Sequence, residues 1–191
     1  MKTSTFRFAM ILLFSLSLIS GCEDESNSGN PELVQNPSIE NGNQSPSSWF
    51  PSDYADSDTQ VIWSDVQAYD GIRSLQLSSD NADASAGWWG QTYEDKIPHG
   101  KKLRLSCKIK LDNVVGDGVS IAFRGDNNTK PEFFYSTQGK INITGNHDWE
   151  EFSVEMDTKI PDTVVRIYIF LIMLNNTTGS VYFDDVSLKK I

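Results

Sequence analysis

The chain has 191 residues, of which 38% are hydrophobic, so it is long enough for one domain with a real core and short for two. It carries 26 acidic and 16 basic residues, which gives a formal net charge of −10. This acidic excess argues against nucleic acid or an anionic membrane as the main partner, because both present negative charge.

The N-terminal segment has the composition of an export signal. Lys2 and Arg7 form a basic start, and the apolar run 8–19 is too short for a helix that spans a membrane. The segment ends in "LISGC", which resembles the lipobox of bacterial lipoproteins. This resemblance implies that residues 1–21 are a lipoprotein signal peptide and that Cys22 carries a lipid anchor. The alternative is an ordinary signal peptide with a coincidental cysteine.

Removal of the signal peptide would change both the charge and the cysteine content. Without Lys2 and Arg7 the chain keeps 14 basic residues against 26 acidic ones, a net charge of −12. With Cys22 acylated, Cys107 has no partner in the chain, and the exported domain is held by its core instead of a disulfide. Cys107 stands at an apolar position of an alternating run, which favours a buried, inert thiol.

The next segment, residues 22–31, is predicted to be an acidic tether. It is polar and lacks apolar periodicity, as is typical of linkers. An acidic run directly after the anchor resembles the signals that place lipoproteins on the cell surface in Bacteroidota. We therefore expect a lipid-anchored protein of the outer membrane or cell surface, exported through the lipoprotein pathway, with one domain at residues 32–191.

From residue 32 on, short β-rich runs alternate with segments that favour turns. No run of comparable length shows a helical stripe with capping residues. The expected strands cover residues 59–66, 73–79, 102–111, 118–125, 149–156, 163–173 and 180–188. Many short strands at near-regular spacing predict an all-β fold, namely an antiparallel β-sandwich or jelly roll.

The run 163–173 is apolar on both faces. Ile167 and Ile169 belong to one row, and Tyr168 and Phe170 belong to the other. If the first row faces the core, the second is too apolar for bulk solvent. The second row therefore lines a groove or forms an interface with another protein.

The last expected strand contains two adjacent carboxylates, Asp184 and Asp185. Neighbouring side chains of a strand point to opposite faces, so one of the two should face the core. On parity we expect this to be Asp184, which alternates in step with Val186 and Leu188. A carboxylate on that face needs a compensating partner.

Six motifs follow one another along the mature sequence. They are "LVQNPSIENG" (33–42), Trp49, "AYDGIRSLQL" (68–77), "IPHGKKLRLSCKIKL" (97–111), "DWEEFSVEM" (148–156) and "GSVYFDDVSL" (179–188). In this order they resemble the carbohydrate-binding modules of families 4, 9, 16 and 22, over essentially the whole mature domain. Ile39 and Leu103 depart from the pattern, which has Phe and Tyr there, but both exchanges suit a core. The resemblance implies a galactose-binding-like jelly roll that binds glycans.

The same resemblance implies a structural calcium ion where the first strand, the Asp-Gly turn and the last strand meet. The ligands would be Glu40, Asp70 or a carbonyl beside it, backbone oxygens near Ser38 and Arg73, and Asp184. Calcium accepts such a mixture of carboxylate and carbonyl oxygens. The alternative is that Glu40 and Asp70 are solvated turn residues and that the last strand is an exposed edge.

Glycan-binding members of these families use aromatic and polar side chains on one sheet. An aromatic ring covers the apolar face of a sugar, while polar groups bind its hydroxyls. The first candidates are Trp88 and Trp89, which cannot both face the core from one strand, and Gln91, which shares the parity of Trp89. A tryptophan pair that caps the ends of the core is the alternative.

Four further residues complete the candidate glycan site. Arg124 has the parity opposite to its apolar neighbours in the run 118–125 and could donate hydrogen bonds. Tyr168 and Phe170 offer aromatic rings. Trp49, in a loop after the first motif, is a rim candidate or a lid over the core.

No catalytic constellation stands out. His99 and His147 lie in turn segments, and neither G-x-S-x-G nor H-E-x-x-H occurs. We therefore expect a protein that is not an enzyme and that captures polysaccharide or oligosaccharide for a neighbouring glycan-degrading enzyme or transporter. The alternative is a structural or protein-interaction lipoprotein that uses the Tyr168 and Phe170 face.

Overall fold

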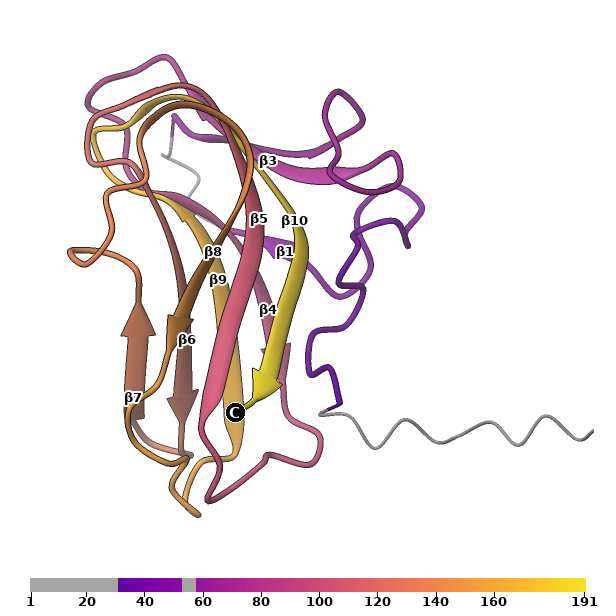
Figure 1. Cartoon of the computed structure of the whole chain (residues 1–191), viewed down its shortest axis with the longest axis vertical. Helices are drawn as coiled ribbons and strands as arrows, with labels where there is room; N and C mark the ends of the chain where they lie inside the picture. Colours follow the sequence, from indigo (N-terminus) through magenta and orange to yellow (C-terminus); the bar gives the residue numbers. More distant parts are fainter. Residues whose placement is uncertain (1–30, 53–57) are drawn as a thin grey trace, which may run out of the picture.

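A computed structural model describes residues 31–52 and 58–191, so the expected signal peptide, Cys22 and nearly all of the tether lie outside the described residues. Two antiparallel five-stranded sheets pack face to face (Figure 1). This confirms the predicted antiparallel β-sandwich. Within the described ranges, no helix is long and apolar enough to cross a membrane.

The first sheet, here called the β9 sheet, has the order β1-β4-β9-β6-β7. Its strands are β1 (Phe50–Pro51), β4 (Gly87–Tyr93), β9 (Arg166–Met173), β6 (Val119–Asp126) and β7 (Pro131–Ser136). The second, the β10 sheet, has the order β2-β3-β10-β5-β8. Its strands are β2 (Gln60–Ser64), β3 (Ser74–Ser79), β10 (Thr178–Lys190), β5 (Leu103–Val115) and β8 (Gly145–Glu155).

The alternation read from the sequence locates most strands. In β5, Leu103, Leu105, Cys107 and Ile109 are all fully buried, while the residues between them are half-buried on the outer face. Burial raises the pKa of the Cys107 thiol well above its usual value, which confirms a buried thiol and disfavours its reactive thiolate. By contrast β7, "PEFFYS", was missed because it starts with proline and runs three aromatic residues together.

The N-terminal segment is fastened to the last strand. The N–H of Leu33 donates to the carbonyl of Leu188 (3.1 Å), and the N–H of Val186 donates to the carbonyl of Pro37 (3.0 Å). From the other sheet, Gln91 accepts from the N–H of Gln35 (2.7 Å) and donates to its carbonyl (2.8 Å). The segment therefore closes the sandwich between both sheets.

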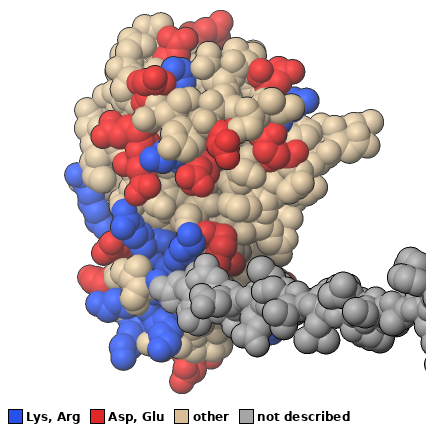
Figure 2. All heavy atoms as spheres, turned by 45° about the vertical axis from the view of Figure 1, so that its right-hand side comes forward, with Lys and Arg blue, Asp and Glu red and all other residues tan. Residues whose placement is uncertain are grey.

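The surface charge is unevenly distributed. In Figure 2, acidic side chains are scattered mainly over the part of the domain away from the point where the chain enters it, and a cluster of basic side chains lies beside that point. The first described residue, Pro31, lies at the same end of the sandwich as the C-terminus (Figure 1). The chain is acidic as a whole, but its surface is basic beside the point where the chain enters the domain.

The two hydrogen bonds between the Gln91 side chain and the Gln35 backbone, here called the Gln91 clasp, should stabilise the fold. Gln91→Ala should lower the free energy of unfolding by about 1–3 kcal/mol, because the backbone groups of Gln35 lose their partners. Urea denaturation followed by tryptophan fluorescence measures it. The matched control is Gln76→Ala on the outer face of β3, for which we expect about 0.5 kcal/mol or less. Equal losses in both variants would contradict the clasp.

Candidate functional site

Aromatic rings gather on the outer face of the β9 sheet. Strand pairing places Phe170 between Gly90 of β4 and Ala122 of β6, the smallest side chains available. A Cβ atom added to Gly90 would lie 2.6 Å from the Trp88 ring and 2.9 Å from the Phe50 ring. The glycine is therefore what allows these two rings to lie across β4.

The rings contact one another in two ways. Trp88 meets Phe170 edge-on, with centroids 5.4 Å apart, and meets Phe50 edge-on at 5.7 Å. Tyr168 and Phe170 are nearly parallel, with an interplanar angle of 17° and a centroid distance of 6.0 Å. Such contacts fix the ring orientations before any ligand arrives.

A guanidinium group completes this surface. Arg124 lies 4.9 Å from the centroid of the Tyr168 ring, within the range of a cation–π contact. Asp126 holds it through two hydrogen bonds, of 2.8 Å from Nε and 2.9 Å from Nη2. The bidentate pair fixes the position of Arg124 and leaves its charge balanced.

These side chains line one end of a groove. A hollow of about 370 Å³, the aromatic end, is lined by Phe50, Trp88, Arg124, Tyr168 and Phe170. A second hollow of about 510 Å³ shares Trp88 with it and extends past Ile172 to Asn175. The groove therefore continues along the face of β9.

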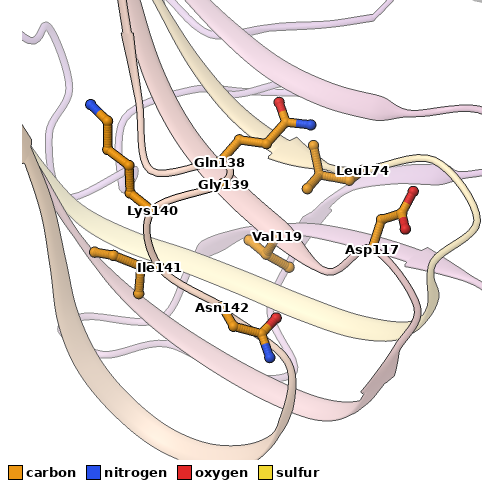
Figure 3. Close-up of a pocket in the computed structure, with 8 residues that line it drawn as sticks. All are labelled: Asp117, Val119, Gln138, Gly139, Lys140, Ile141, Asn142 and Leu174. Atoms are coloured by element: carbon orange, nitrogen blue, oxygen red, sulfur yellow. The ribbon is translucent and has the colours of Figure 1, made fainter.

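The far part of the groove, the polar end, is built by loops. A third hollow of about 610 Å³ shares Asp117, Gln138 and Leu174 with the second. Figure 3 shows Leu174 between the Gln138 amide and the Asp117 carboxylate. Lys140 and Asn142 lie on the loop that also carries Gln138. A ligand that extends from the aromatic end would meet hydrogen-bonding groups here.

The structure brings together four of the seven residues predicted for the glycan site: Trp88, Arg124, Tyr168 and Phe170. Sequence reasoning missed Phe50, because its only signal was its position beside another aromatic residue. It also missed the polar end, whose Asp117, Gln138 and Asn142 come from loops without a motif.

The other three predicted residues are wrong as ligand contacts. Trp89 (3% exposed) and Gln91 (1% exposed) point into the sandwich, where Trp89 donates to the carbonyl of Gln76 (3.2 Å). Trp49 is 4% exposed and donates to the carbonyl of Asn36 (3.2 Å), so it is the lid over the core. Adjacent strand residues do face opposite ways, but parity alone did not decide which tryptophan faced inward.

The predicted metal residues meet at a second location. Asp184 has no exposed surface, and its Oδ2 accepts from the N–H groups of Tyr69 (2.8 Å) and Asp70 (3.2 Å). Glu40 Oε1 accepts from the N–H groups of Ile72 (3.0 Å) and Arg73 (2.8 Å). Both carboxylates are therefore fixed by the same turn, residues 69–73.

Asp184 is buried, but the prediction that it shares the core face with Val186 and Leu188 is wrong. Asp184 pairs with Lys108 and Ser187 pairs with Ser106, so β10 carries an extra residue at this point. Asp185 occupies the resulting β-bulge with a φ of +46°, a conformation that aspartate tolerates. Asp184 thus shares the outer face with Lys108, and the turn 69–73 covers it there.

Two of the predicted metal ligands remain less engaged. The Asp70 carboxylate accepts from the N–H of Gly71 (2.9 Å) and is exposed, and Ser38 is half-buried in the first loop. Gly71 has a φ of +72°, and an added Cβ would lie 2.5 Å from Glu40. Only glycine therefore lets the turn approach the Glu40 carboxylate.

Glu40 and Asp184, held by the turn 69–73, are here called the carboxylate junction. Two negative charges at this junction repel each other. Burial and, as a smaller cause, the charge of Glu40 raise the pKa of Asp184 to about 6, although three backbone N–H donors act to lower it. A hard cation would relieve this repulsion, and carboxylate and carbonyl oxygens suit Ca²⁺. Within the described residues, no three His, Cys, Asp or Glu side chains form a metal cluster.

The comparisons with known proteins address the fold. No protein-family model and no curated protein matches the sequence. The structure is similar to TmCBM61, solved with β-1,4-galactotriose, with a TM-score of 0.55 and 19% identity over 85% of this chain and 100% of that one. It is similar to the CBM22-1 xylan-binding domain of Paenibacillus barcinonensis Xyn10C, with a TM-score of 0.54 and 15% identity over 85% and 96% of the two chains.

A third similar structure is a Stig cyclase from Fischerella sp. TAU, with a TM-score of 0.59 and 14% identity over 85% of this chain and 98% of that one. Together these likenesses define the class: the chain has the jelly-roll fold of carbohydrate-binding modules. The same fold also occurs in a cyclase, so fold alone does not assign the chemistry.

The raised pKa of Asp184 predicts how stability depends on pH in calcium-free buffer. Between pH 4 and 6 the folded state binds more protons than the unfolded state, so stability falls as pH rises through this window. The cost should reach at most about 3 kcal/mol above pH 6. Denaturation in EDTA at several pH values should show this slope in the wild type. Asp184→Asn should lack it, and equal slopes in both proteins would contradict the assignment.

Proposed function

We propose that this protein binds a polysaccharide or oligosaccharide without catalysis, in the groove on the outer face of the β9 sheet. The observation that carries the proposal is the aromatic end, where Trp88, Tyr168 and Phe170 form a surface held in place by ring contacts. Flat apolar rings suit the apolar faces of sugars. A strand that only built the core would not need to present such rings on its outer face.

The charged and polar groups suit hydroxyls. Arg124 lies at the aromatic end, and the Gln138 and Asn175 amides lie beyond Trp88. A row of rings followed by amides matches a glycan of several sugars better than a single monosaccharide. TmCBM61 and the Xyn10C domain, which bind a galactotriose and xylan, support a chain-like ligand.

In this proposal the groove binds a glycan and does not catalyse a reaction on it. Asp126, beside the aromatic end, accepts from two nitrogen donors of Arg124 and is a poor candidate for a base. Asp117 lies at the polar end, in a different hollow. The rival function, capture of a partner protein by the Tyr168 and Phe170 face, is one outcome of the test below.

We further propose that the lipid on Cys22 anchors the domain to the outer membrane or cell surface, as the lipobox-like "LISGC" indicates. There the domain would concentrate glycan for a neighbouring glycan-degrading enzyme or transporter.

A structural calcium ion at the carboxylate junction is the remaining part of the proposal. Glu40 and Asp184 would supply carboxylate oxygens, with carbonyl oxygens near Ser38 and Arg73 and the Asp70 turn completing the shell. Bound there, the ion would neutralise the two carboxylates and join the first loop, the turn 69–73 and the last strand. Asp184 belongs to the β10 sheet and the groove to the β9 sheet, so an ion bound at the junction would act on stability.

Glycan binding is tested with a panel of soluble polysaccharides in affinity electrophoresis, using the mature chain. We expect retardation by at least one polysaccharide, and Trp88→Ala and Tyr168→Ala should each weaken binding about ten-fold or more. The matched control is Tyr69→Ala, an exposed tyrosine (47% exposed) that packs on Trp149 away from the groove. No binding to any polysaccharide, together with a captured protein lost on Tyr168→Ala, would favour the rival function.

Calcium binding is tested by thermal shift and calorimetry. At calcium concentrations about a hundred-fold above the Kd, the wild type should gain roughly 5–10 °C in Tm relative to EDTA. Asp184→Ala should abolish the gain, whereas Asp185→Ala, the exposed neighbour, should retain it. A wild type whose Tm is the same in calcium and in EDTA would contradict the proposal.

A further inference from the structure

Five basic residues form a patch at the end of the sandwich where the chain enters. The basic patch consists of Lys101, Lys102, Arg104, Lys189 and Lys190. Strand pairing assembles it: Arg104 lies opposite Lys189, and Lys190 lies opposite Leu103. The N–H of Ile191 donates to the carbonyl of Lys102 (3.0 Å), which joins the chain end to the same surface. Figure 2 shows a cluster of basic side chains, in blue, beside the entry point.

The patch contains an unfavourable pairing. Like charges directly opposite on neighbouring strands destabilise a sheet, and Arg104 and Lys189 are such a pair. Acidic neighbours offset this pair: Arg104 contacts Glu151 at 3.1 Å and Glu155 at 3.8 Å, and Lys189 contacts Glu32 at 3.5 Å. The five basic residues of the patch outnumber these three carboxylates, so the patch keeps a net positive charge on a strongly acidic chain.

The patch also borders a hollow. The hollow measures about 280 Å³ and is lined by Arg104, Ser106, Glu151, Ser187, Lys189, Lys190 and Ile191. The Nε atom of Arg104 is buried and faces Glu155 at 3.8 Å, beyond hydrogen-bond distance. The guanidinium and ammonium groups have the chemistry that binds a phosphate group, although the Glu151 carboxylate lines the same hollow.

The chain enters the domain beside this hollow. Glu32 accepts from the hydroxyl of Ser187 (2.7 Å) and from the N–H of Leu188 (2.8 Å), so the chain leaves the domain beside the patch. Ten peptide steps separate Cys22 from Glu32, which allows a reach of at most about 35 Å. A lipid on Cys22 would therefore keep this end of the domain near the membrane.

We propose that the basic patch docks on the anionic phospholipid headgroups of the membrane that holds the anchor. This inference rests on the lipid attachment proposed above. The net charge of the chain disfavours an anionic membrane as a partner of the whole surface, but the patch presents positive charge at the one end that the anchor brings close. Docking would orient the domain with its acidic end toward solvent.

The test uses the full chain, expressed in a bacterium with the lipoprotein pathway and reconstituted into vesicles. Mass spectrometry of the N-terminal peptide first establishes the lipid. Vesicles of phosphatidylcholine alone are then compared with vesicles in which phosphatidylglycerol makes up roughly a third of the lipid. The readout is the reaction of each lysine with a water-soluble amine reagent, with Lys140, at the polar end of the groove, as internal reference.

We expect labelling of Lys189 and Lys190 to fall at least about two-fold on the anionic vesicles, with Lys140 unchanged. Lys101→Gln combined with Lys102→Gln should restore labelling of Lys190, because each lysine removed weakens docking roughly five-fold. The matched control Lys140→Gln should leave the protection intact.

Three results would overturn the proposal. Equal labelling on both vesicle types, with the lipid attached, would show that the patch does not touch the membrane. Equal protection on both types would show that the acids of the tether cover the patch instead. An N-terminus without lipid would remove the basis of docking, whereas glycan binding, measured separately, would stand or fall on its own.

Discussion

Strand β9 is apolar on both faces, and the second sheet can cover only one of them. The inner row, with Ile167 and Ile169, is fully buried against the β10 sheet. The outer row, with Tyr168 and Phe170, is covered among the described residues by rings and a guanidinium from the neighbouring strands. The groove follows from this constraint: gaps at Gly90 and Ala122 make room for the rings, and Asp126 fixes Arg124 above them.

The closure of the domain depends on a different compromise, at Asp184. A carboxylate without exposed surface is costly, and it is tolerated because the bulge at Asp185 turns it toward the amides of the turn 69–73. The same turn also donates to Glu40. The amides that stabilise Asp184 therefore bring a second carboxylate close to it. The junction thus joins chain segments far apart in sequence and leaves an excess of negative charge that a cation would balance.

The sequence predicted the sandwich and much of the groove because both depend on alternation. Side chains at Tyr168, Phe170 and Arg124 lie where period-two patterns place them, and their strands pair side by side. Prediction failed where geometry is not periodic. Parity could not say which of two adjacent tryptophans faces inward, and a bulge changed the parity of β10 before Val186. The polar end of the groove comes from loops, whose meeting in space no local pattern records.

The most direct test of the groove is the tryptophan indole N–H region of an NMR spectrum during titration with a bound glycan. The chain has five tryptophans. The signal of Trp88 should move at saturating glycan, because its ring lines the aromatic end. The signals of Trp49, Trp63 and Trp89, whose indoles donate to backbone carbonyls inside the domain, should stay in place. A shift of Trp149, on the other sheet, with Trp88 unmoved would contradict the account.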